Sequence, residues 1–172
     1  MNKSMQAITT TTVSVLIITL VIGTPALLAL GDNDKELNSL SFKIDGSYMG
    51  EPAVFQYWFN HINTEDELFR MTTTGKSEGK ILLEWVVQKG NEAFYKDSEN
   101  TGGTWQAVPY MENLWTKLRD PVLSERGIDF WLGIEGEEEY IIMEGESGGE
   151  EEVKLYDISV NEPIEESIFD PQ

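Results

Sequence analysis

The sequence of 172 residues contains no cysteine and a single histidine, His61. Without cysteine the chain has no disulfide, no thiolate metal ligand, no lipidated N-terminal cysteine and no cysteine nucleophile. A lone histidine cannot assemble a zinc or haem site, where several donors must converge, and no nucleophile-elbow pattern accompanies it. We therefore assign His61 no role, and we expect a protein that is not an enzyme and holds no cofactor or metal.

Positive charge is also scarce, since 12 Lys and Arg residues stand against 31 Asp and Glu residues, for a net charge of −19. Residues 1–31 carry only Lys3, so residues 32–172 have a net charge of −20. A nucleic-acid-binding protein needs a basic surface to neutralise phosphates, and anionic lipid surfaces repel an acidic domain for the same reason. We expect no nucleic-acid partner.

Glutamate is concentrated near the C-terminus, where residues 129–172 hold 15 acidic residues and one basic residue, Lys154. The clusters Glu137-Glu138-Glu139 and Glu150-Glu151-Glu152 lack the spacing of a calcium-binding loop. No pair of carboxylates is singled out for glycoside hydrolysis, and no glycine-rich phosphate loop is present. We interpret the clusters as a solvated surface, or as a surface for a positively charged partner.

The longest apolar run lies at the N-terminus, where residues 13–30 are 18 uncharged positions, mostly Val, Ile, Leu and Ala. About 20 residues of helix cross a bilayer, so residues 8–30 are predicted to contact the lipid bilayer as a membrane-spanning helix. The alternative is a cleaved signal peptide, with Lys3 as its basic start and Ala29-Leu30-Gly31 as the small-residue site. We favour an uncleaved signal anchor at residues 1–31, because the run is longer than a usual signal-peptide core.

The charges on either side of the apolar run predict its orientation. Lys3 precedes the run, whereas Asp32 and Asp34 follow it directly. The positive-inside tendency places the N-terminus in the cytoplasm and the rest of the chain outside, in a single-pass protein of the cell membrane. Residues 32–38 then form a polar stalk, and residues 39–172 form one extracytoplasmic domain.

Alternation of apolar and polar residues predicts that this domain is mainly β. The alternation groups Leu40, Phe42, Ile44 and Tyr48, then Ala53, Phe55, Tyr57 and Phe59, then Ile81, Leu83, Trp85 and Val87. Shorter strands are predicted at residues 68–74, 93–96, 105–108, 128–135, 140–144 and 153–160. About nine strands with one wet face and short glycine-rich connections indicate an antiparallel sheet or open barrel.

One segment has a helical period instead. Met111, Leu114, Trp115, Leu118 and Val122 recur three or four residues apart after Pro109. Proline is tolerated at both ends of such a helix, so Pro121 near the end is compatible with it, and Gly127 is expected to cap a kinked second half. We expect the apolar stripe of this amphipathic helix to lie on the apolar face of the sheet.

Two stretches resemble a known family. Tyr95-Lys96-Asp97 followed by Trp105 and Pro109 is similar to a "Y-x-D…W-x-x-x-P" hairpin of LolA-like and LppX/LprG-like proteins. Residues 161–171 resemble the "N-x-P-I-x-x-S-x-F-x-P" ending of the same carriers of outer-membrane lipoproteins and lipids. With the order of strands, the resemblance covers residues 40–171. It implies an open antiparallel half-barrel with a helical lid over an apolar cavity that carries or senses acyl chains.

The resemblance also implies which residues surround an acyl-chain ligand. They are three residues of the second predicted strand, two of the fourth and three of the lid: Phe55, Tyr57, Phe59, Leu83, Trp85, Leu114, Trp115 and Leu118. Most of the aromatic residues are expected to be core. The remaining apolar surface would be either a closed core or a cleft for an apolar ligand.

Three functions follow from these observations. The first is an accessory subunit of a membrane protein complex, ion-pumping or electron-transferring, with a structural or lipid-holding role that the anchor supports by raising the local concentration. The second is a secreted or periplasmic carrier or sensor of a lipid, released by signal-peptide cleavage. The third is a pilin-like filament subunit, for which Gln6-Ala7-Ile8 is a poor processing site. We favour the first.

Overall fold

The computed structural model describes residues 36–124, 127–134, 136, 138–144 and 150–171. The membrane-spanning segment predicted at residues 8–30 lies outside the described residues. Among those that are described, no helix is both long enough and apolar enough to cross a bilayer.

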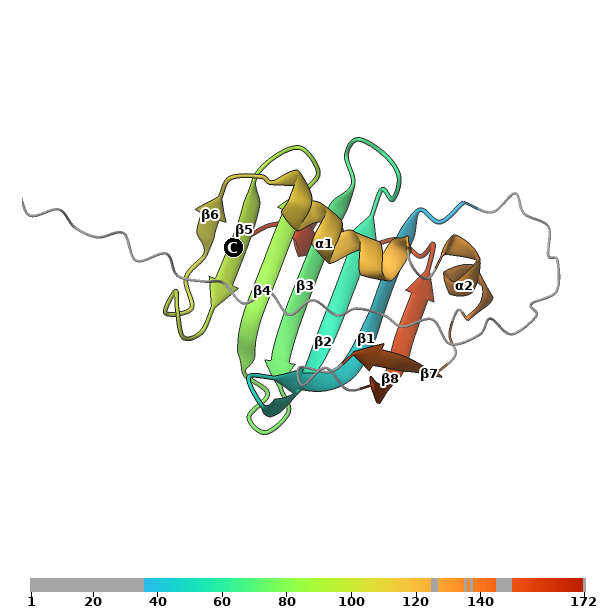
Figure 1. The fold of residues 1–172 in the computed structure, drawn as a ribbon. Coiled ribbons are helices and arrows are strands. Elements are labelled where there is room, and N and C mark those ends of the chain that lie inside the picture. Colours follow the sequence, from blue (N-terminus) through green and yellow to red (C-terminus); the bar gives the residue numbers. More distant parts are fainter. Residues whose placement is uncertain (1–35, 125–126, 135, 137, 145–149, 172) are drawn as a thin grey trace, which may run out of the picture.

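The described chain forms one open antiparallel sheet of eight strands in the order β6-β5-β4-β3-β2-β1-β8-β7 (Figure 1). The strands are β1 (Ser39–Tyr48), β2 (Glu51–Asn60), β3 (Leu68–Gly75), β4 (Ile81–Gln88), β5 (Ala93–Asp97), β6 (Gln106–Val108), β7 (Glu139–Glu144) and β8 (Glu150–Val160). The first six form a meander, and β8 returns to pair with β1. The prediction of a mainly β domain with an antiparallel sheet is confirmed.

Two helices connect the two edges of the sheet. After β6, helix α1 (Glu112–Leu123) crosses one face of the sheet toward β1, and α2 (Ile128–Gly133) follows before β7 (Figure 1). A short 3-10 helix, η1 (Glu166–Phe169), lies on the opposite side of the sheet, behind β3. The sheet is therefore covered by α1 on one face and by the C-terminal segment on the other.

Three rows of side chains cross the sheet on the face that α1 covers, which we call the apolar face. Residues directly opposite one another in antiparallel pairs share a face. The first row is Val160, Leu40, Phe59, Phe69, Val87, Ala93 and Val108; the second is Phe42, Tyr57, Met71, Trp85, Tyr95 and Gln106; the third is Leu155, Ile44, Phe55, Thr73, Leu83 and Asp97. The first two rows are almost entirely apolar, and the third contains Thr73 and Asp97.

The sheet curls at the end that carries the third row. Tyr48 Oη donates a hydrogen bond of 3.3 Å to Asp97 Oδ2, although three strands separate β1 from β5. In a flat sheet that separation would be about 19 Å, four strand spacings, which a side chain does not span. Gly46 assists the bend, because a Cβ there would come within 3.1 Å of the Phe55 ring.

The opposite face carries an ion-pair cluster beneath the C-terminal segment. Glu84 is 1% exposed and pairs with both Arg70 and Lys96, while Arg70 also donates to the carbonyl of Ile168. Although burial alone would raise the pKa of Glu84, hydrogen bonds from Lys96 and Arg70 hold it below its usual value. These contacts, with the buried ring of Phe169, fix η1 behind the sheet.

Three details of the prediction are wrong. Residues 128–135 were predicted as a strand, but Ile128–Gly133 is helix α2, and Gly127 with φ 81° precedes it rather than capping α1. Ile81 was grouped with Trp85, but the pairing shifts between Thr73 and Thr74, so that Ile81 lies opposite Thr74. This bulge turns Ile81 to the other face, where it is 42% exposed.

Candidate functional site

The eight residues predicted to surround a ligand lie on the apolar face of the sheet and on the buried side of α1. Seven of them are buried in one core cluster, and Leu83 is half-buried against it. Helix α1 contributes Leu114, Trp115 and Leu118, which share its buried stripe with Val122 and Leu123. The structure thus places all eight residues in one apolar core, five on the apolar face of the sheet and three on the buried stripe of α1.

Aromatic rings dominate this interface. Trp131 of α2 stacks on Phe42, with ring centroids 4.7 Å apart, and Phe42 stacks on Tyr57 at 4.9 Å. Farther along the sheet, Trp85 stacks on Tyr95 at 5.2 Å. Burial raises the pKa of the Tyr57 hydroxyl well above its usual value, so Tyr57 is neutral at physiological pH. The surface beneath the helices is therefore uncharged and well suited to apolar groups.

A polar contact holds α1 to the loop between β2 and β3. Arg119 Nε donates to Glu67 Oε1 at 2.7 Å, and Arg119 Nη2 donates to Asn63 Oδ1 at 2.7 Å. Glu67 is 1% exposed, and its Oε2 also accepts from the Asn63 backbone N–H at 3.1 Å. We call Arg119, Glu67 and Asn63 the latch. Because Glu67 is buried, its negative charge needs the Arg119 guanidinium beside it.

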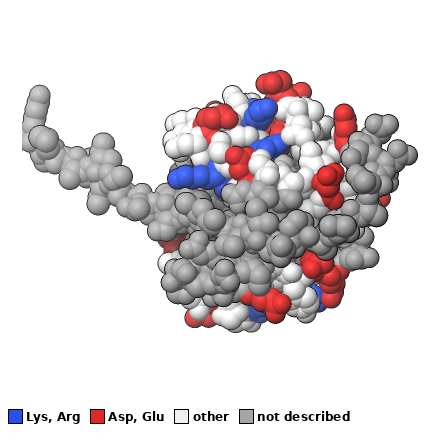
Figure 2. All heavy atoms as spheres, turned by 45° about the vertical axis from the view of Figure 1, so that its right-hand side comes forward, with Lys and Arg blue, Asp and Glu red and all other residues white. Residues whose placement is uncertain are grey.

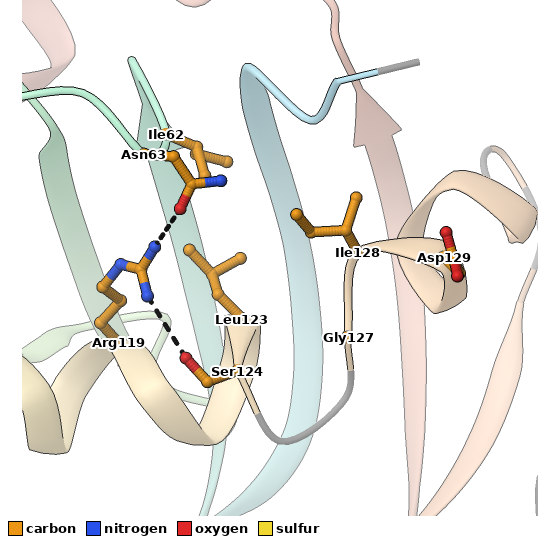
Figure 3. A pocket seen from close by; sticks show the side chains of 8 residues that line it. All are labelled: Ile62, Asn63, Arg119, Leu123, Ser124, Gly127, Ile128 and Asp129. Carbon is orange, nitrogen blue, oxygen red and sulfur yellow. Dashed lines mark hydrogen bonds between the residues drawn. The ribbon is translucent and has the colours of Figure 1, made fainter. Parts of the chain in front are cut away.

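A recess of about 330 Å³ opens beside the latch (Figure 3). Its apolar walls are Ile62, Leu123 and Ile128, and its polar side carries Arg119 with Asn63 and Ser124. Asp129 also lines it, on the α2 side. None of the eight residues predicted to surround a ligand lines this recess. It lies where the β2–β3 loop, the end of α1 and the start of α2 meet.

The third row gives the apolar face one polar margin. Asp97 is buried and accepts hydrogen bonds of 2.8 Å from the backbone N–H groups of Glu99 and Asn100. Although burial alone would raise the pKa of Asp97, these bonds hold it below its usual value. Burial and the neighbouring Asp97 raise the pKa of Tyr48 to about 12. At neutral pH this margin therefore contains a carboxylate and a neutral phenol.

Among the described residues, no group of three His, Asp or Glu side chains is placed to hold a metal ion. In Figure 2, acidic side chains of the described chain are spread around the visible face, with a few basic ones between them. The basic side chains on that face do not form one continuous patch.

Sequence reasoning did not find the latch or the polar margin. One signal for the latch was present: Arg119 falls on the helical stripe of Trp115, Leu118 and Val122, where a cation either extends to solvent or pairs with a buried anion. Glu67 lies 52 residues away, so its identity as the partner depends on the fold. Comparison with known proteins adds no relative, because no family model, curated protein or solved structure matches the chain.

Proposed function

We propose that the protein is a non-catalytic holder of an apolar, acyl-chain ligand, which lies between the apolar face and α1. In this proposal α1 is the lid of a half-barrel. The observation that carries it is the combination of an apolar, aromatic interface beneath α1 with polar attachment of that helix at the latch. A single helix can uncover a large apolar surface when one polar cluster releases it.

The membrane anchor predicted at residues 8–30 would supply the ligand's source. The Asn161 side chain accepts from the Asn38 N–H at 2.7 Å and donates to the Glu36 carbonyl at 2.9 Å, which fixes the start of β1. The Ile62 N–H donates to the Asn38 carbonyl, so the recess lies beside this point. A helix ending at residue 30 would hold the recess close to the bilayer, where lipids are concentrated.

An anchored domain of this kind fits an accessory role in a membrane protein complex, as the sequence analysis favours. The anchor would keep the domain beside its partner and its lipid without a large interface. The acidic surface suits a partner with a basic docking surface. In the alternative arrangement, a cleaved N-terminus would release the same fold as a soluble lipid carrier.

Native mass spectrometry of the full chain extracted from membranes tests the proposal. We expect the chain to carry copurified lipid of defined mass after washing with high salt. The intact mass also shows whether the N-terminal anchor is retained, because a chain that keeps residues 1–31 has a mass of 19.5 kDa. A folded chain that carries no lipid, and takes none up when it is mixed with lipid, would contradict the proposal.

A charged residue on the apolar face should abolish the lipid adduct. Trp85→Asp places a carboxylate in the second row, where Trp85 is 5% exposed. The matched control is Gln88→Asp, at the end of the same strand, where the side chain is only half-buried and points to the opposite face. We expect the adduct to be lost only in Trp85→Asp, with circular dichroism confirming that the sheet is retained. Should Trp85→Asp unfold, the wild-type adduct measurement still decides the proposal.

A further inference from the structure

The Thr73 hydroxyl is a buried polar group on an otherwise apolar part of the sheet. Thr73 is 0% exposed and lies in the third row, with Phe55 of β2 on one side and Leu83 of β4 on the other. Among the described residues, its Oγ1 has no hydrogen-bond partner. A buried hydroxyl without a partner loses its hydrogen bonds to water and gains none in the protein, so such groups are rare in native proteins.

The neighbouring threonine on the same strand shows the contrast. Thr72 points to the opposite face, where its hydroxyl donates to the Glu84 carboxylate at 3.4 Å. Valine has nearly the same shape as threonine, with a methyl group in place of the hydroxyl, so it would fill the space of either residue. The hydroxyl of Thr72 thus has a structural partner, whereas that of Thr73 faces the interface proposed to hold a ligand.

We propose that the apolar face binds a neutral amphiphile, with an acyl chain along the aromatic rows and an uncharged hydroxyl- or ester-bearing head at the third row, hydrogen-bonded by Thr73. This inference rests on the proposed function and names the ligand class. The Thr73 hydroxyl can both donate and accept, so it suits a hydroxyl or an ester carbonyl.

The charge of the polar margin determines which ligand head groups it disfavours. Asp97 lies in the same row as Thr73, with Leu83 of β4 between them. Its carboxylate is ionised at neutral pH, since backbone N–H groups and the Tyr48 hydroxyl stabilise the charged form against its burial. A buried carboxylate repels a nearby anion strongly because the surroundings screen charge poorly. Anionic heads are therefore disfavoured at this margin.

Photo-crosslinking in vesicles tests the inference with the full chain. Phosphatidylcholine vesicles would carry a trace of a diazirine-labelled monoacylglycerol, or of an alkyl sulfate with the same chain and label. We expect the monoacylglycerol to crosslink with a yield on the order of tenfold higher than the sulfate. Asp97→Asn, whose amide oxygen can still accept from Glu99 and Asn100, should raise the yield of the sulfate.

The two threonine variants form a matched pair. Thr73→Val should lower the monoacylglycerol yield about threefold to tenfold, the effect of one hydrogen bond, while Thr72→Val should leave it unchanged. The two variants should also differ in thermal stability. Thr73→Val should raise the Tm of the ligand-free protein by about 3 °C, whereas Thr72→Val should lower it.

The outcomes separate this inference from the proposed function. Equal yields for the two lipids, or a Thr73→Val yield equal to that of the wild type, would overturn the inference and leave the proposed function intact. A lower Tm for Thr73→Val would also overturn it, because the hydroxyl would then have a partner in the protein. Absence of crosslinking with both lipids would overturn the inference and the proposed function together.

Discussion

Arg119 on α1 and Glu67 before β3 form an ion pair of 2.7 Å that joins the helix to the sheet across 52 residues of sequence. The carboxylate is 1% exposed and the arginine side chain 16%. A buried carboxylate that loses its cation is costly, whereas an apolar pair of similar volume at the same place is often tolerated. The latch therefore joins α1 to the β2–β3 loop, and in the function proposed above its release would uncover the apolar face.

The first prediction concerns this pair. Arg119→Met should destabilise the protein by about 3 kcal/mol, because Glu67 is left buried and unpaired. The double variant Glu67→Leu/Arg119→Met should recover most of that loss. Chemical denaturation of the wild type, both single variants and the double variant gives the coupling free energy. Additive losses would show that the two side chains do not hold α1 together.

The second prediction concerns acid. The pKa of Glu84 is held below its ordinary value of 4.5. Its ion pairs therefore contribute their full stability above that pH, and this contribution is lost as the pH falls through the pKa of the folded state. Glu84→Gln should therefore lower stability at pH 7 and flatten its decline between about pH 5 and pH 3. Denaturation midpoints at a series of pH values measure this.

The exposed Glu92 supplies the control for the acid experiment. Glu92→Gln should leave both the stability at pH 7 and the acid slope close to those of the wild type. If Glu84→Gln declines as steeply as the wild type, the ion-pair cluster on the opposite face is not the source of the acid sensitivity.

The third prediction concerns the corner between the helices. Trp131 Nε1 donates to the Val122 carbonyl at 2.9 Å, while its ring stacks on Phe42. Trp131→Phe keeps an aromatic ring but removes the hydrogen bond and the volume of the second ring, and it should cost about 2 kcal/mol. Trp131→Ala leaves a cavity and should cost about 3–5 kcal/mol. Equal losses in thermal unfolding would mean that the ring contributes little to docking α2.

The fourth prediction concerns movement of α1. The sequence has no cysteine, so spin labels can be placed at will, at Lys117→Cys on the exposed side of α1 and at Asn91→Cys in the β4–β5 loop. Pulsed electron paramagnetic resonance should give a longer distance between the two spin labels when the protein is loaded with monoacylglycerol. An unchanged distance at saturating ligand would contradict the role of α1 as a lid.

Much of the fold was predictable because strand and helix periods differ. In β2, apolar residues alternate from Ala53 to Phe59, and the burial alternates with them. In α1, Leu114, Leu118 and Val122 recur at helical spacing, and all three are buried. A single buried face therefore leaves a readable period in the sequence.

The wrong and missing predictions concern segments where the spacing of apolar residues does not reveal the structure. Ile128, Phe130 and Leu132 alternate as in a strand, yet the segment is a helix too short to display its own period, and it buries Trp131. The eight residues expected around a ligand are brought together by the structure, but the latch and the unpartnered Thr73 were not anticipated. Both depend on which residues meet across distant strands and loops, and local sequence does not contain that information.

Mapping the crosslinked peptides shows whether a ligand's acyl chain lies between the apolar face and α1. The full chain in phosphatidylcholine vesicles would be irradiated with a monoacylglycerol that carries the diazirine at the end of its chain. We expect adducts on β2, β4 and α1, at side chains such as Tyr57, Trp85 and Trp115. Adducts confined to residues 8–30 and to the outer surface of the domain would contradict it.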